Sequence, residues 1–170
     1  SHYLRAGYTL PLGSDGWRAG INGSGLSYRL VAAEFLALNG KGTSDSVGLD
    51  ASYPIIRSQL RNLFFLFNHD RKTFDNEANG ATTSRYQLSS TSIGLSGNLF
   101  DNLGGGGANA ANLAYTSGDL DLDGSPTQGA DAITTRAAGS YGKWRYSLSR
   151  QQVITNELPF YGLLSGQVAA

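Results

Sequence analysis

The 170-residue sequence contains no cysteine and no methionine. Without cysteine there is no disulfide, no thiolate nucleophile and no cysteine-built metal site. The two histidines, His2 and His69, are too few for a His-built zinc centre without carboxylate help, so we expect no metal and no cofactor. A complete chain begins with methionine, so a sequence that starts at Ser1 leads us to expect a segment of a longer protein.

Charge and long apolar runs are also scarce. Charged residues make up 15% of the chain, against about 25% in typical soluble domains. Thirteen basic and thirteen acidic residues give a net charge of zero, whereas nucleic-acid-binding proteins usually carry a basic excess. No run of about 18 apolar residues occurs, so the sequence predicts no transmembrane helix. This does not exclude a membrane β-barrel, whose strands alternate apolar and polar residues.

The sequence is rich in glycine, and its apolar and polar residues alternate in many stretches. Glycine, with 23 residues, is about twice as frequent as usual, which disfavours a helical bundle because each interior glycine costs about 1 kcal/mol. Apolar and polar residues alternate with a period of two, the pattern of a strand with one apolar face. In the first run, for example, Leu4, Tyr8 and Leu10 are opposed by Arg5 and Thr9. The eight runs lie near residues 4–12, 17–30, 47–55, 62–70, 91–99, 111–116, 143–149 and 160–168.

The connections between these runs alternate in length. Short ones are expected near 13–16, 56–61, 101–108 and 150–157, and long polar ones near 31–45, 71–85 and 118–138. Short periplasmic turns and long extracellular loops are typical of outer-membrane barrels. The sequence therefore predicts an all-β, antiparallel, up-and-down transmembrane β-barrel segment of about eight strands, located in the outer membrane of a Gram-negative bacterium and in contact with its lipid. With this orientation the first strand runs toward the periplasm.

The second run changes phase. After Ser24 and Gly25 the apolar positions become Leu26, Tyr28 and Leu30, and a glycine-associated bulge would explain this slip. Aromatic residues near the ends of the apolar phase are expected to form the girdles of a membrane barrel. They are Tyr8, Trp17, Tyr28, Tyr53, Tyr115 and Trp144.

Polar-phase residues are expected to line the lumen of the barrel. Charges of both signs on such a wall can form internal ion pairs or set an ionic preference in a water-filled pore. The lumen-lining residues that the pattern predicts are Arg5, Arg18, Asn22, Arg29, Asp50, Asp70, Ser96, Lys143 and Arg145.

Three local motifs suggest other chemistry but lack essential parts. The stretch from Asp119 to Gly124 matches the first half of a calcium loop, yet its twelfth position is Ala130 instead of a bidentate Glu. The four glycines at 104–107 are followed by neither the Lys-Ser/Thr pair nor the helix of a phosphate loop, so a tight turn is expected. No G-x-S-x-G elbow and no Ser–His–Asp arrangement is visible, so we expect no enzymatic activity.

Five stretches together resemble one known family. They are SYPIIRS at 52–58, NL at 62–63 leading to HDRK at 69–72, GGGGAN at 104–109 continuing to TSGDLD at 116–121, YSLSRQ at 146–151 and LSGQ at 164–167. In order and spacing they are similar to the outer-membrane transporter of two-partner (type V) secretion systems, the haemolysin secretion/activation family (ShlB/FhaC/HecB-like, TpsB). The resemblance covers essentially all 170 residues.

The resemblance implies a sixteen-stranded outer-membrane barrel that follows two periplasmic POTRA domains and exports an unfolded, β-rich exoprotein without ATP. Residues 1–170 would then be a partial barrel domain from the middle of the barrel, about half of it, with no POTRA domain. The family's plug helix and its lumen loop with an Arg-Gly-Tyr-like motif have no counterpart here, so their functional residues cannot be carried over. The segment on its own is expected either to be poorly stable or to self-associate through its first and eighth strands.

Other interpretations stay open at this point. A soluble β domain would hold the aromatic residues in its core. A small eight-stranded barrel would serve as a structural outer-membrane protein or a surface adhesin. An outer-membrane hydrolase is a third alternative, which a cluster of carboxylate or histidine residues on the lumen face would favour.

Overall fold

The computed structural model describes residues 1–30, 39–133, 138–155 and 158–170. Most of them belong to β-strands, and the one α-helix in these ranges, α1 (Gln128–Ile133), is six residues long. A 3-10 helix, η2 (Leu103–Gly105), lies in the turn between two strands. The eight strands are β1 (His2–Leu12), β2 (Trp17–Arg29), β3 (Lys41–Arg57), β4 (Arg61–Ala78), β5 (Ala81–Asp101), β6 (Gly107–Asp121), β7 (Gly139–Thr155) and β8 (Leu158–Ala169).

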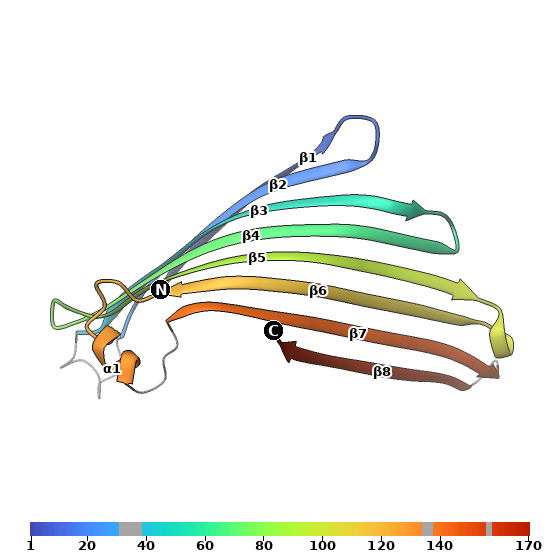
Figure 1. The fold of residues 1–170 in the computed structure, drawn as a ribbon. Coiled ribbons are helices and arrows are strands. Elements are labelled where there is room, and N and C mark those ends of the chain that lie inside the picture. Colours follow the sequence, from blue (N-terminus) through green and yellow to red (C-terminus); the bar gives the residue numbers. More distant parts are fainter. Residues whose placement is uncertain (31–38, 134–137, 156–157) are drawn as a thin grey trace.

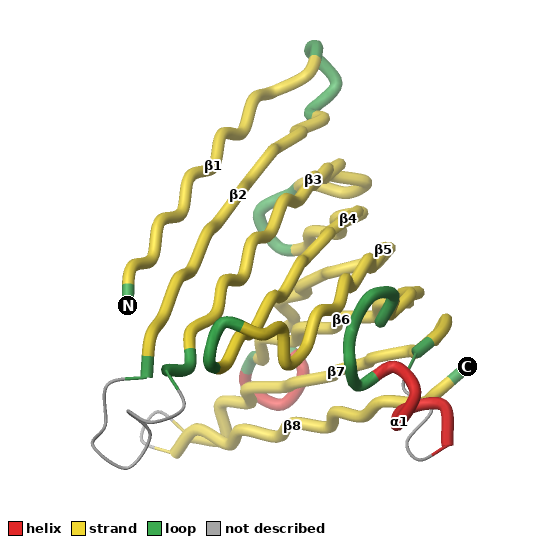
Figure 2. Tube along the Cα trace, turned by 90° about the vertical axis from the view of Figure 1, so that its left-hand side faces the viewer, coloured by secondary structure: helices red, strands yellow, loops and turns green. Residues whose placement is uncertain are grey.

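Each strand pairs in antiparallel fashion with the next strand in sequence, so the spatial order is β1 to β8. This arrangement confirms the prediction of an all-β, antiparallel fold with about eight strands (Figure 1). The sheet curls, and β1 and β8 remain its two separate edges (Figure 2). The described strands therefore form an open, partial-barrel sheet and do not close into a small eight-stranded barrel.

The sheet is a single layer. No hydrophobic residue in the described ranges is buried, and Ile21, Val47 and Leu49 are each at least half exposed. The accessible surface is 11803 Å², whereas a compact monomer of this mass exposes about 8,000 Å². A soluble β-sandwich buries one face of each sheet against the other, and the described chain has no second layer to do so.

The strand registers divide the side chains into an apolar face and a polar face. Directly paired residues of neighbouring strands point to the same side of a sheet. One row of paired residues crosses all eight strands and is wholly apolar: Leu10, Ala19, Ala51, Phe67, Ile93, Tyr115, Trp144 and Val168. The adjacent row on the opposite side is Thr9, Gly20, Asp50, Asn68, Ser92, Thr116, Lys143 and Ala169.

The bulge expected near Ser24 and Gly25 is absent, and that prediction is wrong. The β2–β3 register runs without a shift from Arg18 to Arg29, which places Leu26 and Tyr28 on the polar face. The apolar residues change side because β2 continues beyond the apolar part of the sheet, where its surroundings differ. Register shifts occur elsewhere, between Pro54 and Ile56, between Asn76 and Glu77, and between Val153 and Thr155.

The long loop expected at 71–85 is also wrong. β4 continues to Ala78, β5 begins at Ala81, and only two residues connect them. Asn79 and Gly80 both have positive φ, at 52° and 78°, as in a type I′ hairpin turn. Both faces are mostly polar in this hairpin, so no alternation revealed its strands.

The other two expected long loops are shortened by strand extension. β3 begins at Lys41, before the start that the alternation predicts at Val47, and residues 31–38 lie outside the described ranges. The 118–138 connection contains the end of β6 and α1, and its residues 134–137 are not described. The strand ends that these connections join lie at the same end of the sheet as α1 and the β4–β5 hairpin, whereas the β1–β2, β3–β4 and β5–β6 turns lie at the opposite end (Figure 1).

Candidate functional site

Small polar residues dominate the central part of the polar face. Along β3 the polar-face positions are the less exposed ones: Gly42 and Gly48 are buried and Ser44, Ser46 and Asp50 are half-buried. The intervening residues from Lys41 to Leu49 on the other face are exposed. This difference is expected if the polar face is the inner surface of the curled sheet.

Hydrogen bonds between polar-face side chains connect neighbouring strands. Ser24 and Ser46 share a 2.7 Å hydrogen bond between β2 and β3. The Thr116 hydroxyl donates to the Ser92 hydroxyl at 3.1 Å between β6 and β5. Three further bonds follow the same pattern: Asn62 Nδ2 to Asn98 Oδ1 (3.0 Å), Asn76 Nδ2 to Ser84 Oγ (2.8 Å) and Asn112 Nδ2 to Ser147 Oγ (3.2 Å). Tyr28 joins this face by donating to Asn76 Oδ1 at 2.8 Å.

The structure places eight of the nine predicted lumen residues on this one face. By register they are Arg5, Arg18, Asn22, Asp50, Asp70, Ser96, Lys143 and Arg145. Arg29 is the exception, because the uninterrupted β2–β3 register pairs it with Lys41 on the other side. Arg57 and Lys72 also belong to the polar face, although the alternation pattern does not predict them. Lys72 was missed because the extension of β4 was not recognised.

The polar face carries more basic than acidic residues. Its cations by register are Arg5, Arg18, Arg57, Lys72, Lys143 and Arg145, and its acids are Asp50 and Asp70. In the part of the chain that the structure describes, none of these eight residues forms an ion pair. Lys143 lies over the Tyr141 ring, with its Nζ 5.8 Å from the ring centre.

All three described ion pairs belong to the opposite side of the sheet, beyond the apolar rows. Lys41 Nζ lies 2.8 Å from Glu77 Oε2, and Arg85 Nη2 lies 2.6 Å from Asp75 Oδ2, both toward the end with the long connections. The third pair, Arg150 and Asp101, is the least exposed of the three and lies beside the turn that contains η2.

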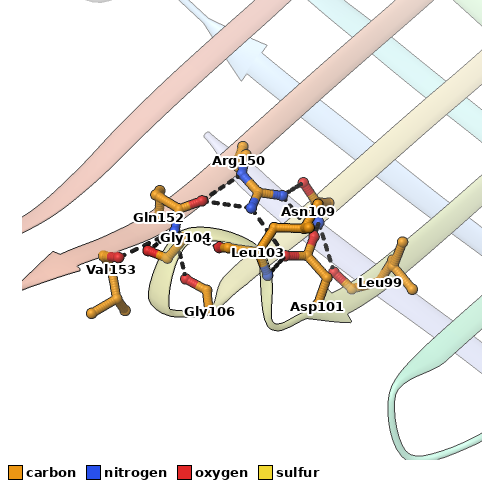
Figure 3. A network of polar contacts seen from close by, with 9 residues as sticks. All are labelled: Leu99, Asp101, Leu103, Gly104, Gly106, Asn109, Arg150, Gln152 and Val153. Atoms are coloured by element: carbon orange, nitrogen blue, oxygen red, sulfur yellow. Dashed lines mark hydrogen bonds and ion pairs between the residues drawn. The ribbon is translucent and has the colours of Figure 1, made fainter.

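The Arg150–Asp101 pair is the centre of a polar network (Figure 3). Arg150 donates from Nη1 to Asp101 Oδ2 at 2.7 Å and from Nη2 to Oδ1 at 3.0 Å, a two-bond geometry that adds directional strength. Asn109 accepts from Arg150 Nη1 at 2.6 Å and donates to Asp101 Oδ2 at 2.7 Å. Asp101 is the last residue of β5, beyond the apolar rows. There the Arg150 guanidinium and then the Asn109 amide hold the pKa of its carboxyl well below the usual range.

Gln152 extends this network to the turn. Its Nε2 donates to the backbone oxygens of Leu103, Gly104 and Gly106 at 2.8 to 3.1 Å, while its Oε1 accepts from Arg150 Nε at 2.9 Å (Figure 3). The glycine run thus forms a tight turn that leads into β6 at Gly107, as the absence of phosphate-loop residues indicated, and the side chains of Gln152 and Asp101 both bond to its backbone. The network ties the β5–β6 turn to β7.

Aromatic rings pack on one another across the apolar face. Trp17 and Tyr53 stack with ring centroids 4.8 Å apart, and Phe65 meets Trp17 edge-on at 6.4 Å. Tyr115 and Trp144 pack at 4.9 Å and border an apolar groove of about 310 Å³. Five of the six predicted girdle residues lie on this face by register, whereas Tyr28 lies on the polar face.

No catalytic arrangement or metal centre is visible in the described ranges. His69 contacts Thr91 Oγ1 through its Nδ1 at 2.9 Å, on the apolar side of the sheet. In the calcium-loop-like stretch, Asp121 Oδ1 accepts from the Asp123 amide and Asp123 Oδ1 accepts from Gln128, so both carboxylates hold the turn. Within the described residues, no group of three or more His, Asp or Glu side chains is placed to hold a metal ion.

The described ranges contain no helix that combines the length and the apolar character needed to cross a membrane.

A family model described as "Haemolysin secretion/activation protein ShlB/FhaC/HecB" matches residues 1–170, the whole chain. The search of curated proteins and the search of solved structures found no match. The sequence resemblance described above is confirmed by this match.

Proposed function

Because the chain belongs to the haemolysin secretion/activation family of ShlB, FhaC and HecB, we propose that residues 1–170 form part of the wall of an outer-membrane pore that exports a β-rich exoprotein. The family consists of two-partner secretion transporters of the Gram-negative outer membrane, which work with secreted exoprotein partners. It is a family of transporters and not of enzymes.

The observation that carries the proposal is the contrast between the two faces of one layer. A sheet with an unbroken apolar row across eight strands needs an apolar surrounding for that face. Outer-membrane lipid supplies it, since transmembrane barrels present an apolar band to the bilayer and a polar interior. The strands are 11 to 21 residues long, and about 9 to 11 residues suffice to cross the membrane.

The polar face has the chemistry of a wall along which a polypeptide can move. Its central positions are small, as at Gly48, Ser92 and Thr116, which leaves space in front of the sheet. An extended chain has free backbone N–H and C=O groups, and hydroxyl and amide side chains can exchange hydrogen bonds with them. The wall binds no part of the chain tightly, so conduction is passive and is driven by folding of the exoprotein outside the cell.

The free edges of β1 and β8 complete the proposal. Unpaired backbone groups at a sheet edge attract further strands. In the complete transporter these edges pair with other strands of a larger barrel, for which residues 1–170 are a partial domain. In the isolated segment the same edges lead to self-association.

Cysteine labelling of the full-length transporter tests this function. The segment contains no cysteine, so Ser96→Cys and Leu95→Cys introduce thiols at neighbouring positions on opposite faces of β5. We expect a water-soluble thiol reagent to label Ser96→Cys, and a stalled exoprotein to protect it. The matched variant Leu95→Cys should stay unlabelled in lipid. Labelling of Leu95→Cys with protection of Ser96→Cys in the empty transporter would show that the faces are reversed.

A further inference from the structure

The charges of this neutral chain are distributed unequally between the two sides of the sheet. By register the polar face holds six cations and two acids, although the sequence has thirteen of each sign. Six acids lie on the other side by register, and three of them, Asp75, Glu77 and Asp101, each form a described ion pair. The inner surface therefore has a net positive charge that the composition does not reveal.

The two acids of the polar face are also the more enclosed groups. A Cβ atom at Gly20 would lie 2.6 Å from Asp50 Oδ1, and a Cβ at Gly48 would contact Asp70 Oδ1. Both carboxylates thus lie over a glycine of the neighbouring strand, close to the backbone, and both are half-buried. Since no side chain rises from these glycines, the acids can lie flat against the sheet.

The cations of the polar face are more exposed than its two acids. Arg5, Arg18, Arg57, Lys72 and Arg145 are exposed, and Lys143 is half-buried. They come from strands on both arms of the curled sheet, β1 and β2 on one arm and β7 on the other, with β3 and β4 between them (Figure 2). None of them is neutralised by an ion pair in the described part of the chain.

We propose that this basic inner surface draws anionic groups into the pore and so favours acidic stretches of the extended polypeptide that passes along it. The inference rests on the proposed function, because it requires the polar face to line a conducting pore. A surface lined by one sign of charge raises the local concentration of the opposite sign. Hydrated side chains without fixed partners can serve successive carboxylates without holding any one of them.

Ion selectivity of the full-length transporter in a planar bilayer is the first test, with potassium chloride as the probe. Lys72 and Arg71 are adjacent on β4 and belong to opposite faces, and Arg71 donates to Gln87 Oε1 on its own side. Lys72→Gln should lower the chloride-to-potassium permeability ratio by about twofold, the combined effect on the two ions of one unit charge about 8 Å away in water at an ionic strength of about 0.15 M. Arg145→Gln should lower this ratio to a similar extent, whereas Arg71→Gln should leave the ratio unchanged.

Block of the ionic current by short peptides tests the polypeptide part of the proposal. We expect oligo-aspartate to block at lower concentration than oligo-lysine, and Lys72→Gln to weaken block by oligo-aspartate at low salt. Stronger block by oligo-lysine, or a permeability ratio that responds equally to Lys72→Gln and Arg71→Gln, would overturn the inference.

These outcomes separate the inference from the proposed function. A transporter that conducts ions and secretes its exoprotein, but shows no effect of the inner-face charges, retains the function and refutes the inference. Absence of any conducting pore together with labelling of Leu95→Cys refutes both.

Discussion

On the apolar side of the sheet, all three described ion pairs lie beyond the apolar rows, whereas the eight charged residues of the polar side form no ion pair within the described ranges. A charge close to lipid is costly unless it is paired and hydrogen-bonded. A charge on a wet wall keeps its hydration and gains little from pairing. The difference fits the proposed function, in which the apolar side meets lipid and the polar side meets water.

The two sides of the sheet also differ in the size and the contacts of their side chains. The apolar side presents large side chains such as Trp144 and Leu148, both more than two-fifths exposed, which need a surrounding medium to cover them. The polar side presents hydroxyls and amides that bond to one another, as Ser24 and Ser46 do. The apolar side therefore needs an apolar surrounding, and the polar side suits water and, under the proposed function, a passing polypeptide.

The largest expected effect comes from a charge placed on the apolar side. Leu95→Arg should lower the free energy of unfolding in lipid by about 2 to 4 kcal/mol, the cost of arginine near the middle of a bilayer. Ser96→Arg, one residue further along β5 and on the polar face, should cost much less. Urea unfolding of both variants in lipid vesicles measures the difference. Equal costs would remove the distinction between the faces.

An intermediate effect is expected from two arginines on β7. Arg150→Lys should lower the unfolding midpoint, because a lysine cannot reproduce the two-bond contact with Asp101 or the contacts with Asn109 and Gln152. Arg145→Lys should leave the midpoint unchanged, because Arg145 forms no ion pair within the described ranges. Thermal unfolding of the two variants in the same detergent is the measurement. A larger loss for Arg145→Lys would contradict the contrast between the paired Arg150 and Arg145.

Alternation predicts the fold wherever the two sides of a strand meet different solvents. It identified all eight strands, since residues such as Leu49 and Asp50 differ sharply in polarity. It failed beyond the apolar rows, where Tyr28 lies on the polar face and Arg29 lies on the apolar side. There polar residues lie on both faces, such as Lys41 on one and Asn76 on the other, so alternation carries no information about the backbone.

The ion-pair network could not be predicted for a different reason. Asp101 and Arg150 are 49 residues apart, and only the register through Asn109 on β6 brings them together. Register also decides which charges share a face, so the positive balance of the polar side was hidden in a sequence of zero net charge. The polar-face residues could be named from their phase in the sequence, with Arg29 as the exception.

The smallest expected effect tests whether the strands extend beyond the apolar rows. Gly80 has a φ of 78° in the two-residue β4–β5 turn, a conformation that costs an L-residue about 1 to 2 kcal/mol. Gly80→Ala should therefore lower the free energy of unfolding by about 1 kcal/mol. Gly23→Ala is the matched control, because Gly23 has no positive φ and the nearest atom to an added methyl group, Ser46 O, would lie 3.6 Å away.

The measurement is urea unfolding of both variants in lipid vesicles, with proteolysis of the 71–85 segment as a second readout. If 71–85 is a paired hairpin, Gly80→Ala loosens it and speeds its cleavage, while Gly23→Ala does neither. A long surface loop would tolerate alanine at this position, because loop backbone can relax to a negative φ. If neither readout changes for Gly80→Ala, residues 71–85 form the loop that the sequence pattern predicts. In that case β4 and β5 do not extend beyond the apolar rows.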